Sequence, residues 1–169
     1  MVNPIIIVLL AVVAMSAGGV IAQSTFSELK KDRNLLRFIE LLAAFVISIL
    51  FVTGFGIWQM LLVLMGLATV WTINFFIYKK HADHQIRFIA LGLGLSMNPT
   101  AIISTLVILY ALLAGLIISF KSGKEYKTHI KLFSSIFILS GVLGLFFPGH
   151  IMSNYLAGII IATTFGKFY

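Results

Sequence analysis

The sequence predicts an all-α fold, a polytopic transmembrane helical bundle with six full spans and one short half-span, forming a single integral membrane domain over residues 1–169. Hydrophobic residues make up 60% of the chain and charged residues 10%, whereas about a quarter of a soluble domain is charged. The apolar segments are long enough for helices that cross a bilayer core, which takes about 20 residues each. The chain has no cysteine, which excludes disulfides, thiolate metal sites and cysteine nucleophiles.

The basic residues lie in three short polar segments, 23–37, 79–87 and 121–131, and at the C-terminal end. Twelve Lys and Arg face five Asp and Glu, which gives a net charge of +7. Positive residues resist translocation and stay cytoplasmic, so this pattern predicts an outer N-terminus and a cytoplasmic C-terminus. The cations expected at the lipid headgroups are Lys30, Lys31, Arg37, Lys79, Lys80, Arg87, Lys121, Lys124 and Lys127.

The first span is expected over residues 4–22 as a lone helix opened by Pro4. Val20-Ile21-Ala22 has the small-residue ending of a cleavable signal peptide. No basic residue precedes Ile5, however, and cleavage would leave the first basic cluster on the outer side. The segment is therefore expected to remain as a membrane helix.

Three helical hairpins follow, over residues 38–78, 88–120 and 132–166, each with Gly or Pro at its turn. No turn carries Lys or Arg, so each hairpin is expected to cross the membrane and return. The spans expected within them are 38–53, 57–78, 88–98, 99–120, 132–147 and 150–166.

The segment 88–98 is too short for a full span, because it covers only about 16 Å as a helix. Two interpretations stay open. In the first, the helix also includes residues 84–87, and the Arg87 side chain extends back to the membrane interface. In the second, the segment is a half-helix that neighbouring helices cover. Arg87-Phe88-Ile89 also repeats Arg37-Phe38-Ile39, which indicates either duplication of a hairpin or the outline common to hairpins that obey the charge rule.

Small residues at four-residue spacing predict where helices pack closely, because backbones in lipid approach through such positions. The packing residues expected from this spacing are Ala14, Gly18, Ala22, Ala111 and Gly115. Gly141 and Gly144, which are three residues apart, are expected to pack in the same way.

Ionisable residues inside a span are candidate functional groups, since placing them in lipid is costly. Glu40 is the one acid within an expected span. It is interpreted as reaching the interface and pairing with Arg37, or alternatively as a ligand for a substrate or ion. The four histidines, at positions 81, 84, 129 and 150, all fall in expected loops or turns, so no haem, metal or other cofactor is predicted. Anionic lipid accounts for the basic loops, and no nucleic acid is expected.

Lys80-His81-Ala82-Asp83, followed by a short apolar helix, resembles the motif region of the prepilin leader peptidases, which are membrane aspartyl proteases. Both glycines of that family's motif are absent here. The resemblance implies that Asp32 and Asp83 are the catalytic pair, sharing a proton and activating water.

The second half of the chain, residues 91–169, resembles the acid-resistance membrane proteins of the HdeD type. Gly92-Leu93-Gly94 before Asn98-Pro99, and Gly141-Val142-Leu143-Gly144 before Pro148, carry this resemblance. It covers two of the three expected hairpins.

The function expected from the sequence is non-catalytic, namely an accessory or structural subunit of a membrane complex or a self-associating bundle, in a bacterial or archaeal cytoplasmic membrane. The expected partners are membrane lipids and other membrane subunits or further copies of the chain. One alternative is the divergent aspartyl protease. The other is a passive channel or carrier, whose polar lining would be Ser48, Thr72, Asn74, Ser104 and Thr105.

Overall fold

The computed structural model describes residues 3–25, 32–52, 56–77, 82–97, 100–122, 125–146 and 149–165. These residues form an all-α bundle of seven helices, which confirms the all-α helical-bundle part of the prediction. The helices are α1 (Pro4–Ser24), α3 (Arg33–Phe51), α4 (Ile57–Ile77), α5 (Ala82–Met97), α6 (Ala101–Ser122), α7 (Tyr126–Gly144) and α8 (Gly149–Phe165).

Helix α1 begins at Pro4, the residue predicted to open it. The Asn3 side chain accepts a hydrogen bond of 3.0 Å from the backbone N–H of Ile5, and Pro4 occupies the first turn. The cap satisfies one of the free N–H groups at the helix start, and proline has none to satisfy.

Three helices begin earlier than predicted. Helices α3, α5 and α7 begin at Arg33, Ala82 and Tyr126, against expected starts at residues 38, 88 and 132. The expected starts mark where hydrophobicity begins, but each helix already begins within the last part of the basic segment that precedes it. Arg and Lys are good helix formers whose long stems lie along apolar surface. Helix α5 has 16 residues and is about 24 Å long. It therefore includes residues 84–87, as the first of the two interpretations of the short span expected.

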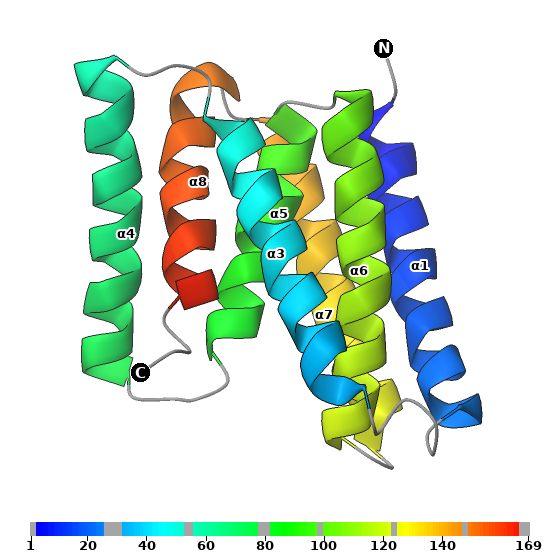
Figure 1. Ribbon diagram of the computed structural model, residues 1–169. Coiled ribbons are helices and arrows are strands. Elements are labelled where there is room, and N and C mark those ends of the chain that lie inside the picture. Colours follow the sequence, from blue (N-terminus) through cyan, green and yellow to red (C-terminus); the bar gives the residue numbers. More distant parts are fainter. Residues whose placement is uncertain are drawn as a thin grey trace.

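The helices run alternately up and down (Figure 1). The lower end of the bundle in this view gathers the ends of α1, α4 and α6 and the starts of α3, α5 and α7. These are the helix ends that flank the three basic segments. The N-terminus lies at the opposite end (Figure 1). The helix ends that flank the basic segments therefore lie at one end of the bundle, which agrees with the sorting of charge that the sequence predicts.

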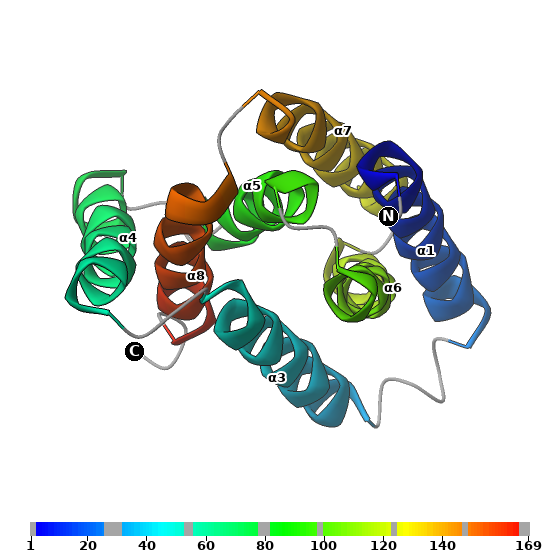
Figure 2. The same cartoon turned by 90° about the horizontal axis from the view of Figure 1, so that it is seen from above.

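Helices α5 and α6 lie inside the bundle, and α4 lies at its edge (Figure 2). Helix α1 packs against α6 and α7, α3 packs against α6 and α8, and α4 packs mainly against α8. Among the described residues, three helical segments are long and apolar enough to cross a membrane, and two shorter ones are also apolar. The long segments are Pro4–Ser24, Asn34–Phe51 and Ala101–Ser122, and the shorter ones are Ile57–Ile73 and Gln85–Met97.

Glycines make the closest helix contacts. A Cβ atom on Gly18 would collide with the backbone of Leu112, and one on Gly115 with the backbone of Met15, so α1 and α6 touch backbone to backbone. This is the close approach that the small-residue spacing predicts. Ala22 and Ala111 are buried on the same two helices, and Ala14 is half-buried.

The other two predicted glycines, Gly141 and Gly144, lie where α7 packs against α1 and α5. A Cβ on Gly144 would lie 2.8 Å from the Leu93 carbonyl oxygen of α5, and one on Gly141 would lie 2.8 Å from the Val8 side chain of α1. The prediction left out a second seam, in which Gly66 of α4 and Gly158 of α8 each meet the facing backbone. On α8, Gly158 and Ala162 have the four-residue spacing that would have indicated it, whereas Gly66 has no small residue four positions away on α4.

Candidate functional site

Arg87 of α5 is the largest fully buried side chain, with a relative exposure of 0%. The expectation that it extends to the lipid headgroups is therefore wrong. Its guanidinium instead reaches into the bundle and contacts residues from α3, α6 and α8. A buried guanidinium needs hydrogen-bond acceptors for its N–H groups and a negative charge nearby, and the surrounding helices supply both.

Each of the three guanidinium nitrogens donates a hydrogen bond. Nη1 donates to Oε1 of Glu40 and to the hydroxyl of Tyr110, both at 3.4 Å. Nε donates to Oγ1 of Thr163 at 3.3 Å, and Nη2 donates to the Thr163 backbone carbonyl. Arg87 thus joins α3, α6 and α8 to α5 through one side chain.

Glu40 provides the balancing negative charge. It is 1% exposed, and its Oε1 lies 3.4 Å from Nη1 of Arg87. The Tyr110 hydroxyl also donates to the same oxygen, at 3.2 Å. The interpretation that Glu40 reaches the interface is therefore wrong, because the carboxylate faces a buried cation from another helix. We call Glu40, Arg87, Tyr110 and Thr163 the buried polar cluster.

The cluster lies nearer the basic end of the bundle than the opposite end. Glu40 is seven residues from the start of α3, and Arg87 is five residues from the start of α5. These separations correspond to about 10 Å and 8 Å along the helices. Thr163 lies two residues before the end of α8, and its own hydroxyl donates to the carbonyls of Ile159 and Ile160 at 3.0 Å.

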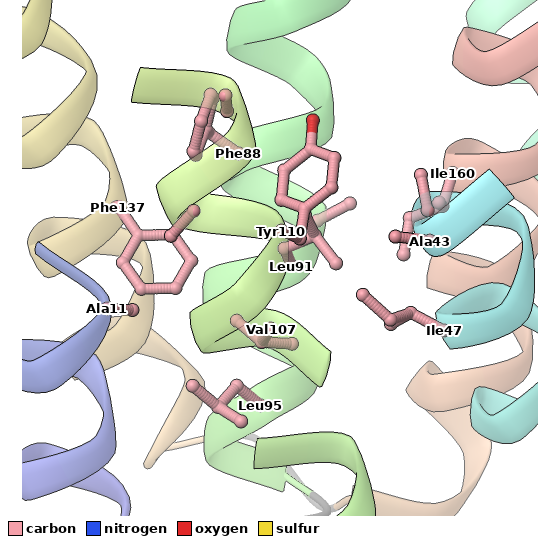
Figure 3. Close-up of a cluster of buried hydrophobic side chains, with 14 of the residues drawn as sticks. Ala11, Ala43, Ile47, Phe88, Leu91, Leu95, Val107, Tyr110, Phe137 and Ile160 are labelled. Atoms are coloured by element: carbon pink, nitrogen blue, oxygen red, sulfur yellow. The ribbon is translucent and has the colours of Figure 1, made fainter. Parts of the chain in front are cut away.

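An aromatic group borders the cluster. Phe88, next to Arg87, is fully buried, and its ring centroid lies 5.8 Å from that of Tyr110 and 5.2 Å from that of Phe133. Phe137 meets Phe88 edge to face at 6.1 Å. Figure 3 shows Phe88, Tyr110 and Phe137 among the buried side chains. These rings and their aliphatic neighbours exclude water, which strengthens the interactions of the charged groups that they enclose.

The suggested catalytic pair, Asp32 and Asp83, lies only partly within the described residues. Asp32 precedes α3 and is exposed, and its side chain makes no capping hydrogen bond. Asp83 falls in the first turn of α5, but its side chain lies outside the described residues. The proton-sharing pair thus stays a prediction. Among the described residues, no group of three or more His, Asp or Glu is placed to hold a metal ion.

The four expected channel-lining hydroxyls all donate to backbone carbonyls three or four residues earlier in the chain. Ser48 donates to the Phe45 carbonyl at 2.6 Å and Ser104 to that of Thr100 at 2.7 Å. Thr72 and Thr105 likewise donate to carbonyls four residues earlier, at 2.8 Å and 2.9 Å. The side chain of Asn74 lies outside the described residues.

The remaining interfacial cations divide into two groups. Arg37, Lys121 and Lys127 are exposed, as headgroup-facing residues would be. Lys30, Lys31, Lys79, Lys80 and Lys124 lie outside the described residues.

The pairing of Glu40 with Arg87 was not among the predictions from the sequence. The one signal for it is the repeated Arg-Phe-Ile, since the second copy begins with Arg87 and the first is followed at once by Glu40. Ser153 and Asn154 were not predicted either, and both are almost completely buried on α8. A polar pair inside an apolar helix is the pattern that would have indicated them.

No family model matches this chain, and searches of curated proteins and of solved structures found no match either. The two family resemblances therefore stay expectations, and function has to be argued from the geometry.

Proposed function

We propose that this chain is a multi-pass membrane protein with a non-catalytic role, which assembles with further copies of itself through the outer face of α4. In this proposal six helices cross the cytoplasmic membrane of a bacterium or archaeon and α5 forms a shorter, covered segment. The N-terminus lies outside and the basic segments lie in the cytoplasm. The buried polar cluster then serves to hold the monomer together.

The outer face of α4 supports this proposal. Ile57, Trp58 and Trp71 are 79–82% exposed, the most exposed large hydrophobic side chains of the bundle together with Phe146. Helix α4 is attached mainly through α8, at the edge of the bundle (Figure 2). A helix with one close neighbour keeps most of its circumference free for lipid or for another polypeptide.

The spacing of exposed residues on α4 favours another helix over lipid alone. One series of exposed positions recurs at intervals of four, three, four and three residues, namely Ile57, Leu61, Leu64, Ala68 and Trp71, and the other exposed positions, Trp58, Met60, Met65 and Thr72, flank it. This heptad spacing places the series in one stripe suited to left-handed packing, the commonest crossing of membrane helices. Two copies in the same membrane share one orientation, so the stripe meets its own copy across a two-fold axis.

Cysteine cross-linking tests this assembly cleanly, because the native chain has no cysteine. A single Leu64→Cys variant, oxidised in native membranes, is expected to give a disulfide-linked dimer on non-reducing gels. Val13→Cys is the matched control, since Val13 is 64% exposed and faces outward from α1 at a similar distance from its helix start. It is expected to stay monomeric. Equal dimer yields from the two variants, or no dimer from either Leu64→Cys or Ala68→Cys, would contradict self-association through α4.

A further inference from the structure

A hollow of about 390 Å³ opens between α5, α6 and α7 near the basic end of the bundle. It is separate from the outer face of α4. Its wall includes the side chains of Gln85, Ile117, Lys121, His129, Leu132 and Phe133. Its volume is within the range of sites that hold small organic molecules.

The wall changes from polar to apolar along the helix axes. On α6, Lys121 and Ser122 form the last two residues, while Ile117 and Ile118 lie one turn further into the bundle. On α7, His129 is followed one turn later by Leu132 and Phe133. The polar part therefore faces the basic end and the apolar part faces the interior. A phospholipid has the same order of groups, from headgroup to acyl chain.

The charge at the polar part favours an anion. Lys121 is an exposed cation at the end of α6, and Gln85 and Ser122 add neutral hydrogen-bond donors. The acid in the wall, Glu125, is 82% exposed and lies 4.0 Å from Nε2 of His129, so solvent weakens its repulsion of an anion.

We propose that this hollow binds an anionic phospholipid from the cytoplasmic leaflet. The lipid phosphate lies against Lys121, Gln85 and Ser122, and the first part of an acyl chain lies against Ile117, Leu132 and Phe133. Basic pockets between membrane helices on the cytoplasmic side recognise such headgroups. The inference rests on the membrane orientation in the proposed function but not on assembly through α4.

The position of the hollow connects it to the buried polar cluster. Phe133 lines the hollow and packs on Phe88 at 5.2 Å, and Phe88 directly follows Arg87 in the chain. A lipid bound there contacts α5, α6 and α7 together. Because it binds the folded bundle, it raises the stability of that bundle.

The test is thermal unfolding of the full chain in mild detergent, with added phosphatidylglycerol, phosphatidylcholine or inorganic phosphate. Phosphatidylglycerol is expected to raise the unfolding temperature saturably, and the other two to raise it far less. Lys121→Gln is expected to weaken the apparent affinity for phosphatidylglycerol about fivefold, the contribution of one cation near an anionic surface. Ile117→Trp, which fills the apolar part of the hollow, is expected to abolish the saturable effect.

Lys127→Gln is the matched control. It removes the same charge from an exposed position on α7 that is not part of the wall of the hollow, and it is expected to bind phosphatidylglycerol as the native chain does. Equal weakening by both lysine variants would overturn the proposal in favour of a diffuse charge effect. Equal protection by phosphatidylcholine or by inorganic phosphate would overturn the anionic lipid as the ligand. Neither result bears on cross-linking through α4, so the two proposals fail independently.

Discussion

Replacing Arg87 with methionine is expected to lower the free energy of unfolding by about 3–5 kcal/mol, because it leaves the Glu40 carboxylate buried without its cation. Methionine keeps the packing of the aliphatic part of the side chain, so most of the loss reports the polar contacts of the guanidinium. The guanidinium bonds to Glu40, Tyr110 and Thr163 disappear together. The measurement is reversible unfolding in mixed micelles with increasing denaturing detergent, followed by circular dichroism.

The double variant Arg87→Met with Glu40→Gln separates a paired charge from two independent groups. If the pair acts as a unit, the second substitution adds little, since removing both charges costs less than leaving one unpaired. The double variant is then more stable than the sum of the two single losses predicts. Strictly additive losses would show that the two side chains do not stabilise each other and would contradict the buried ion pair.

Replacing Gly115 with leucine is expected to separate α1 from α6 and to lower the free energy of unfolding by about 3 kcal/mol, the upper part of the range for overpacked positions. The reason is that even a Cβ atom at this position would collide with the Met15 backbone, which cannot move aside as a flexible side chain can. Gly18→Leu is expected to have the same effect from the other side of the contact, against Leu112. The same unfolding assay measures both.

Ala17→Leu is the control for this seam. Ala17 is the neighbour of Gly18 on α1 but is exposed, so leucine there meets lipid or detergent and is expected to change stability by less than about 0.5 kcal/mol. Losses of equal size at Ala17 and Gly18 would show that the effect comes from the α1 helix itself. The close contact with α6 would then not be its cause.

The helices could be predicted from the sequence because each one leaves a local signal. Apolar length, charge clusters and the Gly or Pro turns gave the number and order of the helices, and Gly18 with Gly115 indicated one seam correctly. The starts of α3, α5 and α7 were placed too late, since hydrophobicity marks the lipid boundary while the helix continues into the basic segment.

The buried polar cluster could not be predicted in the same way. The charge rule treats all cations in a segment alike, but the fold turns Arg87 inward and leaves Arg37 exposed. What decides between them is the partner each one meets, and Glu40 lies 47 residues from Arg87 in the chain. Such pairing depends on how α3, α5, α6 and α8 assemble, and it leaves no periodic pattern in any one segment.

Labelling of single cysteines with a membrane-impermeant maleimide shows which end of the bundle faces the cytoplasm, and both proposals depend on that orientation. Ser24→Cys and Thr128→Cys mark the end that carries the basic segments, and Thr100→Cys marks the other end; all three positions are exposed. In intact cells Thr100→Cys is expected to react, and the other two only after the membrane is permeabilised. Reaction of Ser24→Cys or Thr128→Cys in intact cells, with Thr100→Cys protected, would contradict the proposed orientation.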